Sequence, residues 1–506
     1  MRKRFRNLDT CHRSEELLLP RNAGCGVASK KSDSVRGERS NSNVSSISGN
    51  QIKVLTMNKC KSVLKKMSIE TAPPPPLQDC ISYIKALKKK SVYDLLAEAV
   101  KTDRVLIQPR CGVGGFEQMR LLLLDLENQA KPDVLTLTID SYTRLKRFDV
   151  AADLIKRNPE RLNGFPLVGH GWKSGRQINE SVQVPVEIRH GSPDPRTLFQ
   201  IAIASGFTSF EGAGICYNLP YAKDVPLTDS LKAWREVDEI CGYLAKEDII
   251  VDRELFGTLT AVLVPPSISL AISILEALLA CLSGVKCLSI AYPQNGSLVQ
   301  DIAALRSIPL LAKRYLPGSV NVFPTLHEFM GPFPKDRIKA DALILFGALT
   351  ARLGNATRLI NKTNDEAFGI PTVAANVRGI LTAKVALSTM FDAIKPSQEL
   401  VEEEIEWTLR EVEEILAPIL TSGDLLKGIV RGFEEGGLDI PFSASRYAKS
   451  DVIPLRDVNG AVRYYDSGRL PFSKATKARN QDLLSKNKVI NSNLIERVTK
   501  DIYYFA

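Results

Sequence analysis

The chain has 506 residues, of which 44% are hydrophobic and 25% are charged, a composition typical of a globular chain long enough for one large barrel or for two to three domains. Its longest apolar stretch, LAISILEALLACLSGV from Leu270, is too short to span a bilayer, and the N-terminus has no signal-peptide pattern. We therefore expect a cytoplasmic protein with no membrane partner. The nine cysteines include no C-x-x-C pair, which favours reduced thiols over a disulfide framework or a zinc site.

The net charge of +10 comes entirely from the N-terminal tail. Residues 1–66 contain 15 lysines and arginines against 5 acidic residues, and the rest of the chain contains 52 of each. The tail is rich in Ser, Asn, Gly and Arg and has no hydrophobic period, so we expect it to be disordered. A solvated extension, or a translation start placed too early, explains it better than a nucleic-acid or membrane arm. No nucleic-acid partner is expected.

After the APPPP spacer at Ala72, short apolar runs alternate with amphipathic helical segments such as 230–247 and 341–354, a pattern that predicts an α/β fold. Eight strand–helix units in about 290 residues fit a (β/α)8 barrel of the TIM type, in which chemistry takes place at the C-terminal ends of the strands. The sequence offers nine strand candidates, so one lies outside the barrel or is misread. They are 105–110, 134–140, 164–169, 184–191, 207–212, 249–255, 286–292, 320–329 and 356–363.

We expect the barrel to occupy residues 67–395. Beyond it, the sequence predicts an appended C-terminal region, residues 396–506, that combines helices with a hairpin. An acidic helix is predicted at 397–420, and Asn459-Gly460 is typical of a hairpin turn.

Charged residues stand at or near the ends of several predicted strands: Arg110, Arg144, Arg189, Glu211 and Lys362, with Asn163 just before the third run. One such arginine is most simply a salt bridge at the barrel rim. Three arginines on neighbouring strands indicate a binding site, because buried guanidinium groups are costly unless paired and we expect few acids at the same strand ends. The guanidinium fork matches the two oxygens of a carboxylate or phosphate. A site with three arginines and Glu211 therefore suits the binding of an acidic amino acid, which carries two carboxylates and one ammonium group. None of the four histidines stands in a metal-binding motif, so no metal site is expected.

Nine motifs also carry a resemblance to a known family. The chain resembles the large (epsilon) subunit of glutamate mutase, also called methylaspartate mutase, in order from about residue 85 to about residue 475. The motifs are QPRCGV, TIDSYTR, LNGFP, IRHGSPD, EGAGICYNLPYAKDVPL, GTLTAVLVPPS, QDIAALR, KTNDEAFGIPT and DIPFSASRY. The resemblance implies a (β/α)8 barrel that binds glutamate and shares adenosylcobalamin with a separate small subunit. The implied reaction is the radical interconversion of L-glutamate and threo-3-methylaspartate.

The resemblance also implies roles for individual residues. Glu211 would hold the substrate ammonium and accept its proton, as the catalytic residue. The implied substrate-binding residues are Arg110, Arg144, Arg189, His190, Glu211, Tyr217 and Tyr221. The residues implied to contact adenosylcobalamin are Gly112, Asn163, Pro220, Phe333, Lys362, Glu366 and Ile370; at Gly112, the missing Cβ would let a bulky group approach the backbone.

The family further implies a hetero-oligomer in which the large subunits form a dimer, a heterotetramer with the small cobalamin-binding subunits. The chain itself lacks the Asp-x-His-x-x-Gly signature through which such a small subunit binds cobalt. Two other interpretations stay open. One is a Schiff-base aldolase or lyase that uses Lys362, and the other is a non-catalytic protein that binds an acidic amino acid. The sequence does not distinguish a catabolic from a biosynthetic role.

Overall fold

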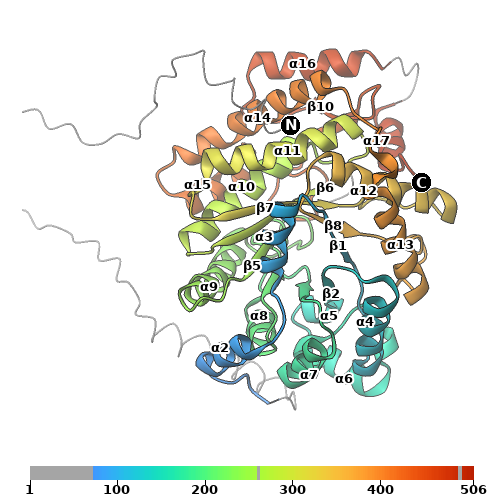
Figure 1. Ribbon diagram of the computed structural model, residues 1–506. Coiled ribbons are helices and arrows are strands. Elements are labelled where there is room, and N and C mark those ends of the chain that lie inside the picture. Colours follow the sequence, from blue (N-terminus) through green and yellow to red (C-terminus); the bar gives the residue numbers. More distant parts are fainter. Residues whose placement is uncertain (1–71, 259–262, 488–492) are drawn as a thin grey trace, which may run out of the picture. The chain divides into compact units, whose positions relative to one another are not determined.

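Eight parallel strands form the centre of the fold in the computed structural model, which describes residues 72–258, 263–487 and 493–506 (Figure 1). Their hydrogen-bonded order is β1-β8-β7-β6-β5-β4-β3-β2. At the junction of the first and last strands in this order, Thr138 N donates to Cys111 O at 2.9 Å, so the barrel is nearly closed. The predicted (β/α)8 barrel is confirmed. The strands are β1 Leu106–Pro109, β2 Leu135–Thr138, β3 Val186–Arg189, β4 Ser209–Glu211, β5 Asp252–Leu255, β6 Cys287–Pro293, β7 Asn321–His327 and β8 Arg358–Asn361.

One of the nine strand candidates, 164–169, is wrong, because it does not form a strand of the barrel. Only one isolated bridge, between Ile139 and Phe165, joins it to the end of β2. Pro166 then caps the N-terminus of helix α7, Leu167–Ser181, and the buried Leu167 and Val168 belong to its first turn. The run is apolar because it packs as a helix start, which a short apolar run does not distinguish from a buried strand.

Helices surround the strands in the usual alternation. Two helices precede β1, α2 Leu77–Ala86 and α3 Val92–Thr102. Those that follow the strands are α4 Phe116–Ala130, α5 Ser141–Arg144, α6 Phe148–Arg157, α7, α8 Arg196–Ala204, α9 Leu227–Lys246, α10 Pro266–Leu282, α11 Leu298–Tyr315, α12 Arg337–Leu353 and α13 Val373–Ala386. The helices predicted at 230–247 and 341–354 correspond to α9 and α12. One-turn 3-10 helices lie at Pro159–Arg161 and Thr389–Phe391.

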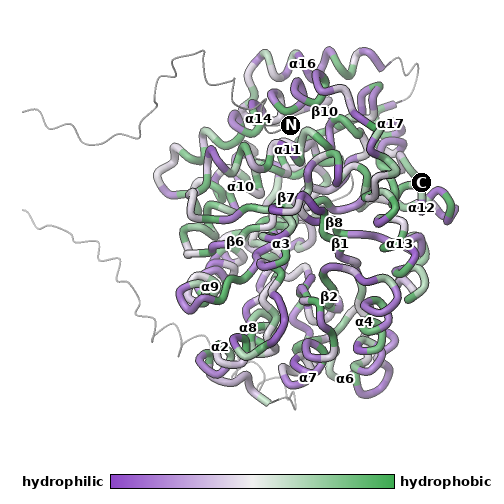
Figure 2. The backbone as a smooth tube through the Cα atoms, in the orientation of Figure 1, coloured by the Kyte–Doolittle hydropathy of each residue, from purple (hydrophilic) through white to green (hydrophobic). Residues whose placement is uncertain are grey.

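Helix α10 contains most of the longest apolar stretch of the sequence (Figure 2). It is buried on most of its surface because α9, α11 and the C-terminal helix α14, Gln398–Leu420, contact it on different sides. Among the residues that the structure describes, no helix combines the length and the apolar character that crossing a membrane requires.

The C-terminal region contains the predicted acidic helix, α14, and the predicted hairpin, β9 Ile453–Arg456 with β10 Val462–Asp466. Gly460 in the turn has φ +74°, a left-handed conformation that glycine adopts without strain. Ser267 Oγ in α10 donates to Glu411 Oε2 in α14 at 2.7 Å, a bond that joins this region to the barrel. The other helices are α15 Leu425–Glu435, α16 Lys474–Ser485 and α17 Leu494–Ile502. The domain boundary at residue 395 stays a prediction, and the tail at 1–66 lies outside the described residues.

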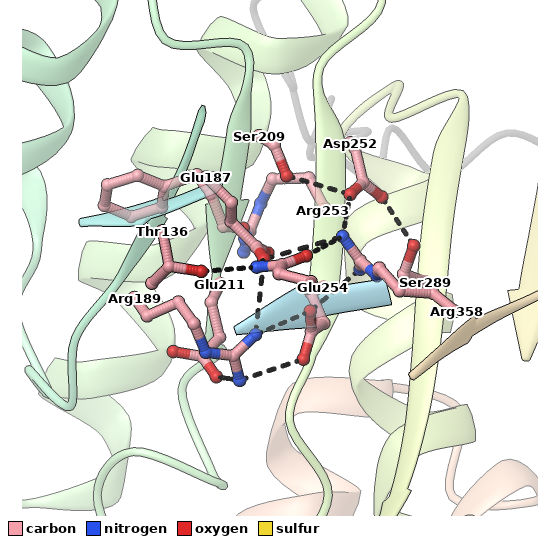
Figure 3. Close-up of polar contacts among 12 residues, drawn as sticks. Thr136, Glu187, Arg189, Ser209, Glu211, Asp252, Arg253, Glu254, Ser289 and Arg358 are labelled. Atoms are coloured by element: carbon pink, nitrogen blue, oxygen red, sulfur yellow. Dashed lines mark hydrogen bonds and ion pairs between the residues drawn. The ribbon is translucent and has the colours of Figure 1, made fainter. Parts of the chain in front are cut away.

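The interior of the barrel is polar and charged (Figure 3). Arg358 at the start of β8 is fully buried; its Nη2 lies 2.8 Å from Glu254 Oε2 and its Nη1 3.2 Å from Asp252 Oδ2. Gln108 Oε1 accepts a further bond from Nη1 at 3.2 Å. Because inward-facing side chains alternate along each strand, these groups come from alternate positions of different strands. A buried guanidinium group surrounded by carboxylates thus takes the place of an apolar core.

This arrangement predicts that Arg358→Met is severely destabilising. Removal of the guanidinium group leaves buried carboxylates without a counter-charge, which costs about 3–5 kcal/mol of unfolding free energy. Arg157→Met serves as the control, because Arg157 forms an exposed pair with Asp153 at 2.9 Å and its loss should change stability little. Urea unfolding followed by circular dichroism compares the two variants, and equal midpoints would contradict the prediction.

Candidate functional site

Arg189, the last residue of β3, lies at the centre of the C-terminal mouth of the barrel and is 2% exposed. Its Nη1 lies 3.2 Å from Glu187 Oε2 and 2.9 Å from Glu254 Oε2, and its Nη2 pairs with Glu211 Oε1 (Figure 3). Strands β3, β4 and β5 each supply one of these carboxylates. The expectation that few acids stand near the strand ends is therefore wrong for Arg189. Its positive charge is compensated within the barrel.

His327 at the end of β7 joins the same cluster. Its Nε2 lies 2.9 Å from both Arg189 Nη2 and Glu254 Oε1. Burial, together with the neighbouring arginines, lowers the pKa of His327 well below its usual value, so the imidazole is neutral. Glu211, Glu254 and His327 offer ligand atoms within 4.8 Å of one another, as a metal site would. The Arg189 guanidinium contacts all three, so a metal ion would have to displace it.

His190, directly after β3, carries a buried hydrogen-bond donor. Its Nδ1 accepts the Ser192 N–H at 3.0 Å, and burial lowers its pKa well below the usual value, so the neutral ring carries its hydrogen on Nε2. The ring stacks on Trp234 with centroids 5.5 Å apart, which fixes its orientation. Within the described part of the chain, Nε2 has no hydrogen-bond partner. A buried donor without a partner is costly, and a bound ligand would satisfy it.

Arg110 and Arg144 differ from Arg189 in their partners. Both are half-buried, and among the described residues neither forms an ion pair with an acid. Arg110 Nη1 lies 3.5 Å from Met330 Sδ, and the buried Nε of Arg144 has no hydrogen-bond partner there. These two guanidinium groups therefore form no ion pair within the described residues, although Arg110 favours the charged form of Glu366 and Arg144 that of Asp140.

Tyr221 lies beside Tyr217, with ring centroids 6.1 Å apart. Its side chain is 48% exposed, yet the protein around it raises the pKa of the phenol, while Arg110, Arg144 and Arg189 each lower it. The charges of the three arginines therefore act on the tyrosine that the sequence assigned to the same site, and their common role in binding stays a prediction.

Residues 212–226, which we call the tyrosine loop, carry Tyr217 and Tyr221 from the end of β4 to α9. Tyr217 is 1% exposed, its ring lies 5.0 Å from that of His190, and its hydroxyl has no hydrogen-bond partner among the described residues. Gly212 has φ +103°, and a Cβ at this position would meet the Tyr217 ring. The close packing of the ring therefore requires glycine at the start of the loop.

Glu276 in α10 holds the beginning of the tyrosine loop, a role that the sequence did not indicate. One carboxylate oxygen, Oε1, accepts the N–H groups of Ile215 and Cys216, each at 2.8 Å. Glu276 is 3% exposed, and burial raises its pKa to about 7. A helix distant in the sequence therefore fixes the backbone next to Tyr217.

Of the group of residues assigned to the cofactor, the structure brings three into contact. Lys362 Nζ lies 3.0 Å from Glu366 Oε2 and 5.1 Å above the Phe333 ring, and Arg110 influences the pKa of both Lys362 and Glu366. The lysine proposed as a Schiff-base nucleophile is therefore engaged in an ion pair. Ile370 is 49% exposed and Pro220 is buried.

Two members of this group have structural partners of their own. Asn163 Oδ1 accepts the Ser141 N–H at 2.9 Å and so helps to position helix α5, which ends at Arg144. A Cβ on Gly112 would come within 2.5 Å of Thr138 O. The glycine is thus required by the neighbouring strand β2, and the sequence-based reason, access for a bulky ligand, is not needed to explain it.

The fold and this site define a (β/α)8-barrel protein with a cluster of arginines and carboxylates at its mouth. The family model of the methylaspartate mutase E chain (MutE) matches residues 87–502. The glutamate mutase epsilon subunit of Desulfitobacterium hafniense is 40% identical over 420 residues, which cover 81% of this chain and 87% of that protein. Those of Escherichia coli O157:H7 and Halobacterium salinarum are 40% and 38% identical, covering 78% and 79% of this chain and 84% of each relative. The chain belongs to the methylaspartate mutase E chain family.

A solved phosphoribosylanthranilate isomerase from Pyrococcus furiosus covers 56% of this chain and is itself covered completely, at 11% identity and a TM-score of 0.29. That score is too low to bear on fold or function.

The buried Glu276 predicts a pH-dependent contribution to stability. Its pKa rises from 4.5 to about 7 on folding, so its contribution is fully present below pH 4.5 and is lost as the pH rises through 7. Glu276→Gln keeps an oxygen acceptor and removes the titration. Between pH 4 and pH 8 the wild type should therefore lose on the order of 3 kcal/mol more unfolding free energy than the variant. Urea unfolding at both pH values measures this difference, and parallel curves would refute the assignment.

Proposed function

We propose that this chain is the large subunit of an adenosylcobalamin-dependent isomerase that interconverts L-glutamate and threo-3-methylaspartate in the cytoplasm. Family membership supports the reaction, and the observation that carries the substrate class is the pair Arg110 and Arg144, which form no ion pair within the described residues. A substrate with two carboxylates would neutralise both.

The substrate would lie between these arginines and the buried cluster at the centre of the mouth. Arg110 and Arg144 would each bind carboxylate oxygens through the guanidinium fork, which also fixes the orientation of the ligand. The Nε2–H group of His190 and the Tyr217 hydroxyl, both without partners in the described chain, would complete the hydrogen bonds. Buried polar groups of this kind discriminate strongly against ligands that cannot pair with them.

Glu211 is the acidic residue placed to receive the substrate ammonium. Its Oε1 pairs with Arg189, and its Oε2 accepts a hydrogen bond from the backbone N–H of His190 at 3.1 Å, so the carboxylate is held in one orientation. Glu211 and Arg189 would together hold the amino acid head group, and Glu211 would take the ammonium proton. Binding the ammonium group and taking its proton is the role that the family resemblance implies for Glu211.

The residues beside the arginines fit an adenosyl group. The ion pair of Lys362 and Glu366 offers a donor and an acceptor, while Phe333 and the exposed Ile370 offer apolar surface. We propose that they hold it together with Gly112, Asn163 and Pro220. When bound, adenosylcobalamin supplies the radical chemistry that removes a hydrogen from C4 of the substrate and returns it after the glycyl unit has migrated. The barrel residues orient the substrate and exclude water.

The cobalt would be held by a partner. None of His12, His170, His190 and His327 has an Asp two residues before it and a Gly three residues after it. A separate small cobalamin-binding subunit would therefore supply the cobalt ligand, and the assembled protein would be a heterotetramer built on a dimer of large subunits. This dependence restricts radical formation to the complete, substrate-loaded site.

The test is reconstitution with a small cobalamin-binding subunit of the same family. With adenosylcobalamin and L-glutamate, the two proteins together should form 3-methylaspartate, measured by chromatography, and the isolated chain should form none. Product without the partner would contradict the shared cofactor site. Glutamate binding without turnover in the complete mixture would favour a non-catalytic acidic-amino-acid-binding protein.

A further inference from the structure

The motif DIPFSASRY, residues 439–447, belongs to the C-terminal region, yet it contacts the tyrosine loop. Ser443 Oγ donates to Leu219 O at 2.6 Å, and Arg446 N donates to Lys223 O at 3.1 Å. The Arg446 guanidinium also pairs with Asp224. Three interactions therefore connect segments more than 200 residues apart. We call residues 439–447 the clamp.

The clamp has its own rigid support. The Asp439 carboxylate is 2% exposed and accepts four backbone N–H groups that enclose the segment, at 2.7–3.1 Å. These donors are Ile440, Ser450, Asp451 and Val452. A carboxylate that satisfies several backbone donors fixes a loop in one conformation. The clamp thus presents Ser443 and Arg446 from a fixed backbone.

The second half of the tyrosine loop depends on this contact. Glu276 holds Ile215 and Cys216 at the beginning of the loop, whereas the residues after Leu219 form no helix or strand before α9. Inside the loop, Asn218 Nδ2 donates to Val225 O at 3.1 Å. Within the described chain, the clamp supplies the hydrogen bonds that the Leu219 and Lys223 carbonyls accept from outside the loop. These carbonyls lie on either side of Tyr221.

We propose that the clamp positions Tyr221, whose ring lies 6.1 Å from that of Tyr217, at the barrel mouth, so that the C-terminal region sets the affinity of the barrel for its substrate. This inference rests on the proposed function for the identity of the substrate. Ser443 and Arg446 are positioning residues, which act on the ligand through the tyrosine loop. Holding the loop before the ligand arrives removes an ordering cost that binding would otherwise carry.

The experiment compares Ser443→Ala and Arg446→Ala with the wild type in the full chain. Arg431→Ala is the matched control, because Arg431 is also exposed and paired, with Glu435 at 3.4 Å, but lies in α15 away from the loop. Hydrogen–deuterium exchange without ligand should be faster in residues 212–226 of the two clamp variants only. Calorimetry should show an L-glutamate dissociation constant raised about fivefold, as expected for one lost hydrogen bond. In the reconstituted complex, KM should rise by a similar factor and kcat should change less.

The outcomes separate this inference from the proposed function. Unchanged exchange in both clamp variants would overturn the clamp, and so would faster exchange with unchanged glutamate affinity. Equal changes in Arg431→Ala would also overturn it, because they would indicate general destabilisation. A wild type that binds no glutamate would instead refute the proposed function. The exchange result alone would then support or overturn the role of the clamp in holding the tyrosine loop.

Discussion

The buried ion pairs inside the barrel are the constraint on which the site depends. Arg189 and Arg358 are each inaccessible to solvent, and Glu187 and Glu254 contact both of them. Neither arginine can move without leaving a carboxylate unpaired in the interior, a change that costs several kcal/mol. An apolar core of equal volume would fold the barrel as well or better. What the charges provide is a guanidinium group held at one position at the base of the mouth.

This constraint separates the arginines into two kinds. Carboxylates on the surrounding strands pair with Arg189 and Arg358, whereas Arg110 and Arg144 are half-buried and form no ion pair in the described residues. The first kind gives the mouth a fixed geometry, and the second gives it charge for a ligand. The tyrosine loop then covers the same space, held at its start by Glu276 and further along by the clamp. Substrate affinity in this account depends on elements from the whole described chain.

Much of the fold follows from local sequence patterns, and much of the site does not. Alternating apolar runs and amphipathic helices identify the eight strands, and the error at 164–169 arose because Pro166 begins a helix inside a run that also suits a strand. The strand ends identify Arg110, Arg189 and Glu211 as candidates. Glu187 and Glu254 were missed, although their alternation within VEIR and DREL places them on the same inward face as their neighbours. Glu276 and Ser443 act through contacts across 60 and 224 residues, which no local pattern reveals. The individual roles in substrate and cofactor binding stay predictions based on the family resemblance.

The most direct test of the central claim is calorimetric titration of the full chain with three ligands: L-glutamate, L-glutamine and glutarate. Glutamine lacks one carboxylate and glutarate lacks the ammonium group, while the carbon chain is the same length. A mouth built from Arg110, Arg144 and the Glu211–Arg189 pair predicts that both bind at least about tenfold more weakly than glutamate, because each loses a charged hydrogen bond in a sheltered site. Equal affinity for all three ligands would contradict the account.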